Sequence, residues 1–176
     1  MNTLDYSIIL LGTIIIISYS RSSLLRPQSH GFYRFFAWEI ILIQFVLNRV
    51  GWFTNAFAWY QMISWILLIG SIIFLILGIR EIKKFGHSMT SFEATTHLVR
   101  TGIYTYIRHP MYTSLLFLTW GIFFKSPFLL DFLISISASI FLYATSQIEE
   151  TENIIKFGND YLDFKKGTKR FIPYIF

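Results

Sequence analysis

The chain has 176 residues, of which 54% are hydrophobic and only 14% are charged, and its formal net charge is +5. Soluble domains carry about 25% charged residues, so this chain has too few charges to cover a water-facing surface. The composition therefore excludes a soluble enzyme, a disordered tail and a nucleic-acid-binding module as leading interpretations, and indicates an integral membrane protein. The chain contains no cysteine, which excludes disulfides, thiolate metal sites and a cysteine nucleophile, and we expect no metal site.

Five apolar runs predict an all-α membrane protein with a single domain over residues 1–176. The first run is not typical of a signal peptide, because no basic residue precedes it and no small-residue cleavage site follows it. About 20 helical residues cross the hydrocarbon of a bilayer, so the second and fourth runs are short, and we expect neighbouring helices to shield them. The predicted spans are residues 4–20, 35–47, 57–79, 110–124 and 128–146.

The distribution of Lys and Arg predicts the orientation of these spans. Thirteen of the 15 lie after the first, third and fifth runs. Because positive charges concentrate in cytoplasmic loops, this pattern predicts five transmembrane helices with the N-terminus outside and the C-terminus in the cytoplasm. A four-span alternative, in which the second run is re-entrant, breaks the alternation. The two large polar segments, 80–109 and 147–176, then share the cytoplasmic face, and we expect the chemistry there.

The polar segment before the fourth run concentrates residues that can bind an anion. Arg108 and His109 precede Pro110, a residue tolerated in the first helical turn, and Tyr104 and Tyr112 flank them. Free N–H groups and the dipole at a helix N-terminus favour a carboxylate or a phosphate at this position. The alternative is a basic membrane anchor with an interfacial belt of tyrosines.

Three acids, Glu149, Glu150 and Glu152, follow the fifth run. The end of a helix disfavours anions, so clustered acids there require a compensating cation. The candidate cations are Arg108, His109 and Arg170. The alternative is that the acids solvate the helix end, which is the preferred interpretation for Glu152 and for at least one of the other two.

Four short motifs, taken together in their order along the chain, resemble those of a known family. They are G-x-Y-x-x-x-R-H-P-x-Y from Gly102, E-E at 149–150, F-G-x-x-Y from Phe157 and R-F-x-P from Arg170. The combination resembles the isoprenylcysteine carboxyl methyltransferase family, within a wider group of integral membrane methyltransferases that includes phospholipid N-methyltransferases. The resemblance covers about residues 75–173, and the first three spans carry no signature.

The resemblance implies S-adenosylmethionine as methyl donor and S-adenosylhomocysteine as product, held by the last two spans and the cytoplasmic segments beside them. The donor's carboxylate suits Arg108 or His109, and its cationic groups suit Glu149 or Glu150. The faces of Tyr104 and Tyr112 can contact a cationic sulfonium. The residues expected to bind the cofactor are His97, Leu98, Val99, Gly102, Tyr104, Arg108, His109, Pro110, Tyr112, Glu149 and Glu150.

The catalytic candidates are Glu150, Arg170 and Arg108. The donor is already activated, so the enzyme mainly positions the acceptor and excludes water. A carboxylate acceptor needs no base, whereas an amine, thiol or phenol must be deprotonated, and Glu150 is the candidate base. If Glu150 pairs with Arg170, we expect the pair to position the acceptor rather than to shuttle a proton.

Three positions depart from these patterns. Thr96 occupies the place of a histidine common in the family, and the neighbouring His97 is the candidate replacement. Asn153 stands where the family usually has leucine, which we interpret as a packing variation. Glu39 lies inside the second run, where we expect it to pair with Asn48 or Arg49 or to reach the cytoplasmic interface, and the alternative is that it lines a tunnel for the acceptor.

The sequence thus predicts a membrane methyltransferase that acts on a lipophilic acceptor, with membrane lipid and no nucleic acid as partners. The acceptor could be a prenylated cysteine carboxylate, an amino phospholipid, or a small hydrophobic thiol or amine. The alternative is a non-enzymatic membrane protein that binds anionic lipid at Arg108-His109-Pro110. A transporter would show ionisable residues in several spans and an internal repeat, and neither is found here. We expect the cytoplasmic membrane of a prokaryote or the endoplasmic reticulum of a eukaryote, with the site facing the cytoplasm.

Overall fold

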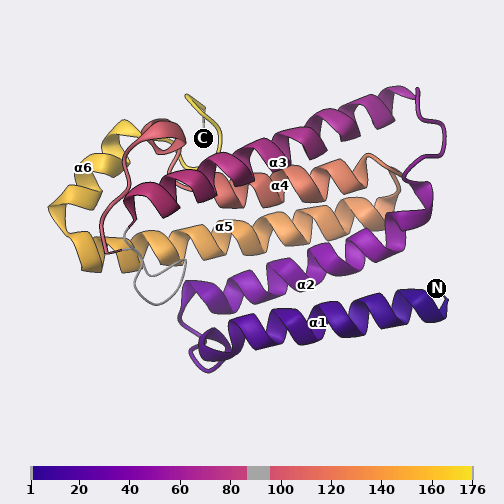
Figure 1. Ribbon diagram of the computed structural model, residues 1–176, viewed down its shortest axis with the longest axis horizontal. Helices are drawn as coiled ribbons and strands as arrows, with labels where there is room; N and C mark the ends of the chain where they lie inside the picture. The colour runs from indigo at the N-terminus through magenta and orange to yellow at the C-terminus, as the bar shows by residue number, and fades with distance from the viewer. Residues whose placement is uncertain (1, 87–95, 176) are drawn as a thin grey trace.

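Five long helices form the body of the protein (Figure 1). The computed structural model describes residues 2–86 and 96–175, so part of the polar segment 80–109 lies outside the described residues. A short sixth helix and two 3-10 turns complete the described chain, in which one isolated parallel bridge joins Ile107 to Lys169 and no strand forms. The predicted all-α class is confirmed. The elements are α1 (Thr3–Leu24), α2 (His30–Asn48), η1 (Arg49–Gly51), α3 (Trp59–Phe85), η2 (Gly102–Thr105), α4 (Pro110–Phe123), α5 (Leu129–Phe157) and α6 (Asn159–Gly167).

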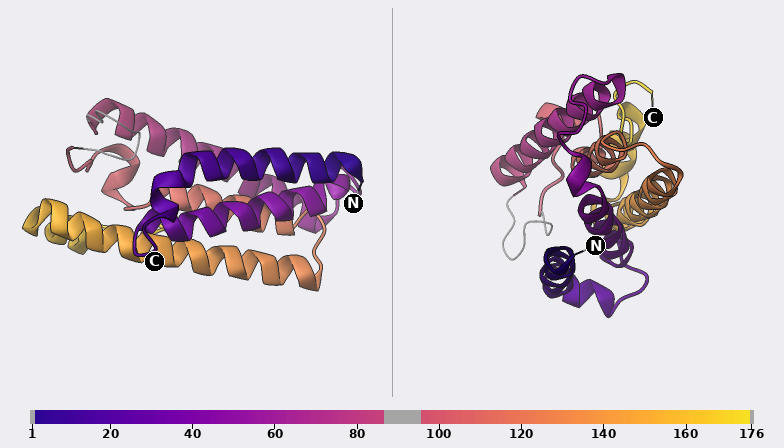
Figure 2. Two further views of the ribbon diagram at one scale, coloured as in Figure 1. Left: turned by 90° about the horizontal axis from the view of Figure 1, so that it is seen from below. Right: turned by 90° about the vertical axis from the view of Figure 1, so that its right-hand side faces the viewer.

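The long helices run alternately up and down the bundle (Figure 1). Helix α2 packs between α1 and α5, and α4 packs between α3 and α5, as the end-on view in Figure 2 also shows. One end of the bundle carries α6 and η2, and we call it the α6 end. The opposite end carries the N-terminus and the connections from α2 to α3 and from α4 to α5. The predicted shielding of the two short apolar runs is therefore observed, since α2 and α4 are the inner helices.

Burial in the bundle differs from that in a soluble protein, because many large aliphatic side chains are exposed and many polar side chains are buried beside the apolar core. Large aliphatic side chains cover the outside, as on α1, where Ile15 is 69% exposed. Small and amide polar side chains lie inside: Gln44 donates to the Ser135 hydroxyl over 2.8 Å and accepts from the Thr119 hydroxyl over 2.6 Å. Between helices in lipid, interhelical hydrogen bonds and close packing replace the hydrophobic driving force. This pattern supports a bilayer as the solvent of the outer surface.

Three helices, α1, α3 and α5, are long and apolar enough to cross a membrane, and α4 is a shorter apolar helix. Helix α2 is not among them, and it carries Arg34 and Glu39. Within residues 2–86 and 96–175 the structure therefore supports a membrane protein with three candidate spans. Five spans and their orientation stay predictions.

Two helices extend past the predicted spans. Helix α3 continues to Phe85 and α5 to Phe157, although the apolar runs end near residues 79 and 146. An apolar run marks the part of a helix that faces lipid, whereas α5 ends where Gly158 turns the chain with a φ of 59°. The prediction that Glu149 and Glu150 meet a helix end is wrong, because both lie inside α5. The predicted start of a helix at Pro110 is confirmed.

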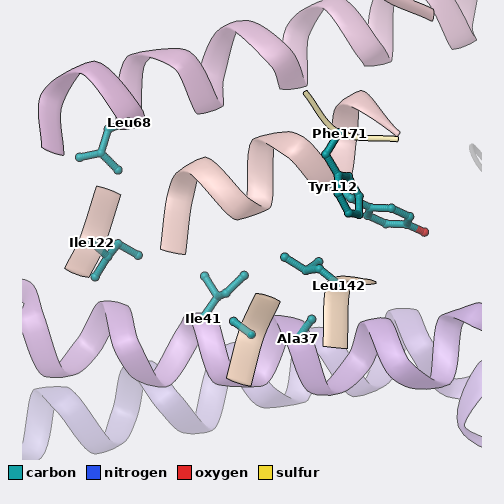
Figure 3. Packing of buried hydrophobic residues seen from close by; sticks show 8 residues of the cluster. Ala37, Ile41, Leu68, Tyr112, Ile122, Leu142 and Phe171 are labelled. Atoms are coloured by element: carbon teal, nitrogen blue, oxygen red, sulfur yellow. The ribbon is translucent and has the colours of Figure 1, made fainter. Parts of the chain in front are cut away.

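The buried apolar core joins four helices to the C-terminal tail (Figure 3). Phe171, from the tail, is 3% exposed and lies beside Tyr112 of α4. The Thr113 hydroxyl donates to the Phe171 carbonyl over 2.9 Å, which fixes the tail against α4. The preceding residue, Arg170, is thereby held beside the start of α4 and the C-terminal half of α5. The cluster comprises Ala37, Ile41, Leu68, Tyr112, Ile122, Ala138, Leu142 and Phe171.

Candidate functional site

A short backbone ladder brings the two basic motifs together. The Lys169 N–H donates to the Tyr106 carbonyl over 3.0 Å, and the Arg108 and His109 N–H groups donate to the Lys169 and Arg170 carbonyls over 2.8 and 3.1 Å. These bonds align two segments that are 62 residues apart in the sequence. Because backbone positions fix where the side chains begin, Arg108 and Arg170 project toward the same part of α5.

A buried carboxylate lies where these side chains converge. Glu150 is 1% exposed, and its Oε1 accepts from the Nε atoms of Arg108 and Arg170, each over 3.0 Å. Its Oε2 accepts from Arg170 Nη2 over 3.0 Å and lies 2.7 Å from Lys165 Nζ. His109 Nε2 lies 3.4 Å from Oε1. We call these five residues the Glu150 cluster. The lone pairs that a general base would use are already occupied by charged donors.

Arg170 is held from three directions. Its guanidinium lies 4.8 Å from the centre of the Tyr143 ring, and Nη2 also donates to Gln147 Oε1 over 3.1 Å. Burial opposes the charged form, but hydrogen bonding to Glu150 outweighs it and raises the pKa of Arg170 above its ordinary value. Arg170 is therefore a fixed cation, with its planar fork locked on the carboxylate.

A cavity of about 990 Å³, counting the space that opens to solvent, lies beside this cluster. Nine of the eleven residues predicted to bind the cofactor line it, contributed by the segment before α4, by α4 and by α5. They are His97, Leu98, Val99, Tyr104, Arg108, His109, Pro110, Tyr112 and Glu149.

Glu149 Oε2, a buried polar atom in this wall, has no hydrogen-bond partner within the described part of the chain. His109 Nε2 also lacks a hydrogen bond of good geometry there, but it lies 3.4 Å from Glu150 Oε1, behind the wall. The Nδ1 atom of His109 lies 3.7 Å from Glu149 Oε2, too far for a good hydrogen bond. Buried polar atoms are normally satisfied, so the unsatisfied oxygen of Glu149, a residue that lines the cavity, marks a place for a polar ligand. The lining combines cations with two acids, Glu149 and Glu152, which fits a molecule that carries both a carboxylate and cationic groups.

Aromatic residues shape the rest of the cavity. The rings of His109 and Tyr112 stack with centroids 5.4 Å apart. Burial, with the charges of Glu149 and Glu81, raises the pKa of Tyr104 well above its ordinary range. Tyr104 is therefore a neutral phenol at any physiological pH, and its ring offers a face or a hydroxyl group rather than a charge.

Two predicted cofactor residues, Gly102 and Glu150, do not line the cavity. Gly102 has a φ of +57°, and a Cβ there would lie 2.5 Å from Glu81 Cδ. Glycine is required at this position so that the chain can turn into η2 beside α3. Glu150 lies behind the wall, where it orients Arg108, which does line the cavity.

The cavity wall also contains residues that the sequence analysis missed. His30 donates its backbone N–H to Glu152 Oε1 over 3.1 Å, and its Nδ1 lies 2.5 Å from Glu152 Oε2. Glu152, which we expected to solvate a helix end, is thus paired across 122 residues. No sequence signal could connect them, whereas Phe157 and Tyr161 belong to the F-G-x-x-Y motif and could have been included. The missed lining residues are His30, Arg34, Ile82, Met111, Glu152, Asn153, Lys156, Phe157, Tyr161 and Phe164.

The three departures noted in the sequence have structural outcomes. His97 lines the cavity, and its neighbour Thr96 is not among the lining residues. Asn153 also lines the cavity, so it does more than vary the packing. The expected partners of Glu39 are wrong: its Oε2 accepts from the Thr13 hydroxyl over 2.8 Å. Asn48 instead donates to Asp131 Oδ1 over 2.6 Å, and Arg49 pairs with Asp5, which places both at the end of the bundle that carries the N-terminus.

Comparison with known proteins gives one match. The family model described as phospholipid methyltransferase matches residues 59–159, which is more than half of the chain and includes α3, α4 and α5. No curated protein and no solved structure matches.

Proposed function

The chain belongs to the phospholipid methyltransferase family, within the wider group of integral membrane methyltransferases, and from this premise we propose that it methylates a lipid acceptor with S-adenosylmethionine. The observation that carries the proposal is the cavity lined by Arg108, His109 and the unsatisfied oxygen of Glu149. It lies mostly in the matched region, between segments that resemble the cofactor site of the isoprenylcysteine carboxyl methyltransferases.

The residues of the cavity fit the cofactor. Arg108 and His109 would hold its carboxylate beside the N-terminus of α4, and Glu149 would hold its ammonium group. Tyr104 and Tyr112 would offer their ring faces to the sulfonium. When bound, the cofactor supplies a methyl group on a positively charged sulfur, which needs no further activation.

Glu150 and Arg170 act on the acceptor in this proposal. Three charged donors on one carboxylate make Glu150 a poor proton acceptor, so we assign it to positioning. It holds Arg108 toward the cofactor and Arg170 toward the acceptor, and a rigid arrangement of this kind lowers the entropic barrier to an in-line displacement.

The family description favours a phospholipid amine as acceptor. A prenylated cysteine carboxylate is the second candidate, because the order R-H-P, E-E and F-G-x-x-Y resembles that family. Radiolabelled donor, offered with phosphatidylethanolamine or with a prenylcysteine, separates the two. Label in the first acceptor alone supports the phospholipid activity, and label in the second alone supports the other.

Cofactor binding can be tested directly by titrating the purified protein with S-adenosylhomocysteine. A charged hydrogen bond contributes about 1.5–3 kcal/mol, so Arg108→Ala should weaken binding by about 10- to 100-fold. His109→Ala should weaken it as well, and Arg21→Ala, which removes an exposed cation from α1, should not. Absence of binding, or equal affinity in all variants, contradicts the proposed function.

We also propose the full topology: one membrane domain over residues 1–176, five spans, the N-terminus outside and the site at the cytoplasmic face. The absence of native cysteine makes single-cysteine labelling free of background. In intact cells, a membrane-impermeant maleimide should label Ser126→Cys and spare Lys166→Cys, and permeabilisation should make both reactive. Labelling of both in intact cells would contradict five spans.

A further inference from the structure

A second group of cations lies beside the cavity and shares Arg108 with it. These cations line a depression formed by α6, the tail and the flank of α5, which we call the basic pocket. Its lining residues are Arg108, Tyr143, Lys165, Lys166, Gly167, Thr168, Lys169, Arg170 and Ile175.

The basic pocket has an excess of positive charge. It contains five cationic side chains, and the acids that pair with them in the described structure are Glu150 and Asp163, at 2.7 Å from Lys165 and 2.8 Å from Lys166. A surplus of three positive charges therefore faces this depression. Surplus charge at an open site favours an anion, and lysine ammonium groups, which act as compact point charges, suit a phosphate.

An apolar groove adjoins the basic pocket. Its walls are one face of α4 and one face of α5, and its exposed surface is almost entirely apolar. The one polar group in the indole of Trp120, its N–H, is satisfied by the Ser139 hydroxyl over 3.2 Å. The groove residues are Leu67, Thr113, Leu116, Phe117, Trp120, Phe124, Ile136, Ser139, Ile140, Tyr143, Phe171 and Ile172.

The two depressions are continuous. Tyr143 lines both of them, and the tail passes from one to the other, with Arg170 in the basic pocket and the next two residues in the groove. The groove runs along helices α4 and α5, which are apolar and whose outer faces carry exposed aliphatic side chains such as Ile140. The basic pocket can thus bind a phosphate, and the adjoining groove can bind a long hydrocarbon chain. A membrane lipid carries these two groups in the same order.

We propose that the basic pocket and the apolar groove together bind one anionic phospholipid, with its phosphate among the cations and an acyl chain along the groove. This site adjoins the cavity of the proposed methyl donor and shares Arg108 with it, but its lysines and its groove lie outside that cavity, and its occupancy does not depend on methyl transfer. Charge complementarity selects the ligand, since a net negative headgroup neutralises the surplus that a zwitterionic lipid would leave.

Native mass spectrometry of the detergent-purified protein measures this binding as one-to-one lipid adducts. Phosphatidylglycerol should bind at least about tenfold more tightly than phosphatidylcholine with the same acyl chains. Glycerol 3-phosphate, which offers the same phosphate without a chain, should not displace it at comparable concentrations. Equal affinity for the two lipids, or displacement by glycerol 3-phosphate, would overturn the proposal.

The charge is tested by the double variant Lys166→Gln with Lys169→Gln, which changes exposed side chains and leaves the Glu150 cluster intact. Each cation near a membrane surface contributes about fivefold to the affinity for anionic lipid, so phosphatidylglycerol should bind on the order of 30-fold more weakly. The matched control, Lys83→Gln with Lys84→Gln, removes the same charge from α3. An equal loss in the control would show a general surface effect and overturn the assignment.

The groove is tested by Ile140→Trp, which places a bulky side chain in the path of the acyl chain. Leu133→Trp is its control, because Leu133 is an exposed residue of α5 outside the groove lining. Phosphatidylglycerol affinity should fall by about tenfold in the first variant and stay within about twofold in the second. An unchanged affinity in Ile140→Trp would overturn the acyl-chain assignment. S-Adenosylhomocysteine binding, measured in the same samples, reports separately on the proposed function and on folding.

Discussion

The protein buries a charged side chain at each end of its bundle and satisfies the two charges in different ways. At the α6 end, Glu150 meets two arginines and a lysine. At the opposite end, Lys125 is 2% exposed, donates to the amide oxygen of Gln61 over 3.1 Å and lies 3.4 Å from the centre of the Trp65 ring. We call Lys125, Gln61 and Trp65 the lysine clasp.

The difference indicates that the Glu150 cluster belongs to a ligand-binding site, whereas the lysine clasp has a structural role. In the lysine clasp, Gln61 Nε2 also donates to the carbonyls of Gly51, Thr54 and Lys125, so one amide closes two interhelical connections. Its charge is met by neutral partners that belong to the chain, and the arrangement is self-contained. The Glu150 cluster instead brings more cations than its carboxylate can neutralise, and these cations border two open depressions. Excess charge is typical of a place that receives a ligand.

The largest effect should follow from Glu150→Gln. The substitution keeps the shape but leaves buried Arg108 and Arg170 without their counter-charge, and breaking a buried ion pair costs about 3–5 kcal/mol of the free energy of unfolding. Misplacement of the two arginines should also lower methyl transfer by at least about 100-fold. Thermal unfolding in detergent and initial rates measure the two effects.

Glu152→Gln is the control for that experiment, because it removes a partly exposed acid two residues further along α5. It should lower the free energy of unfolding by no more than about 1 kcal/mol. Equal losses in both variants would mean that Glu150 holds no special place among the acids of α5. A kcat that falls while the KM for the donor stays constant would support the assignment to acceptor positioning.

A smaller effect, of a different kind, should follow from Gln61→Leu in the lysine clasp. Three carbonyls and Lys125 lose their partner, which should lower the free energy of unfolding by about 2–3 kcal/mol. Binding of S-adenosylhomocysteine should stay within about twofold, because the clasp lies at the far end of the bundle. Chemical denaturation measures the free energy of unfolding, and a binding titration on the same preparation measures the affinity for S-adenosylhomocysteine. A large loss of affinity in the folded variant would contradict the purely structural role of the lysine clasp.

The smallest effect should be the pH dependence of the pair between His30 and Glu152. Burial opposes the imidazolium, but the hydrogen bond and charge of Glu152, with the charge of Glu149, outweigh it and raise the pKa of His30 above 6.5. A raised pKa gives stability that is fully present below the ordinary value and is lost as the pH rises through the folded value. Both side chains are partly exposed, so about 1 kcal/mol or less is expected.

The measurement is the difference in unfolding temperature between the wild type and His30→Gln, taken at pH 5.5 and at pH 8.5. The wild type should lead by more at the lower pH. A difference that does not change with pH would show that His30 contributes by packing alone. This pair is intermediate between the Glu150 cluster and the lysine clasp. Its two charges balance each other, as in a structural contact, but both residues line the cavity.

The sequence alone predicted the helical class, the start of α4 and nine of the nineteen residues that line the cavity, because these depend on local signals. Pro110 marks a helix start by its own geometry, and the motif residues before it lie within one continuous segment. The ends of α3 and α5 were missed, since an apolar run reports contact with lipid rather than the length of the helix. The partners His30 and Lys165 were missed because they meet Glu152 and Glu150 only through the packing of α2 and α6 on α5.

The ladder between residues 106–109 and 168–170 has a consequence for biosynthesis. Arg170 and Phe171 follow every long helix in the chain, so they emerge from the ribosome after Arg108 and Glu150. Until the tail is threaded between α4 and α5, two buried charges and part of the core await completion. The docking of these few residues therefore completes the buried ion pairs and the core in one step.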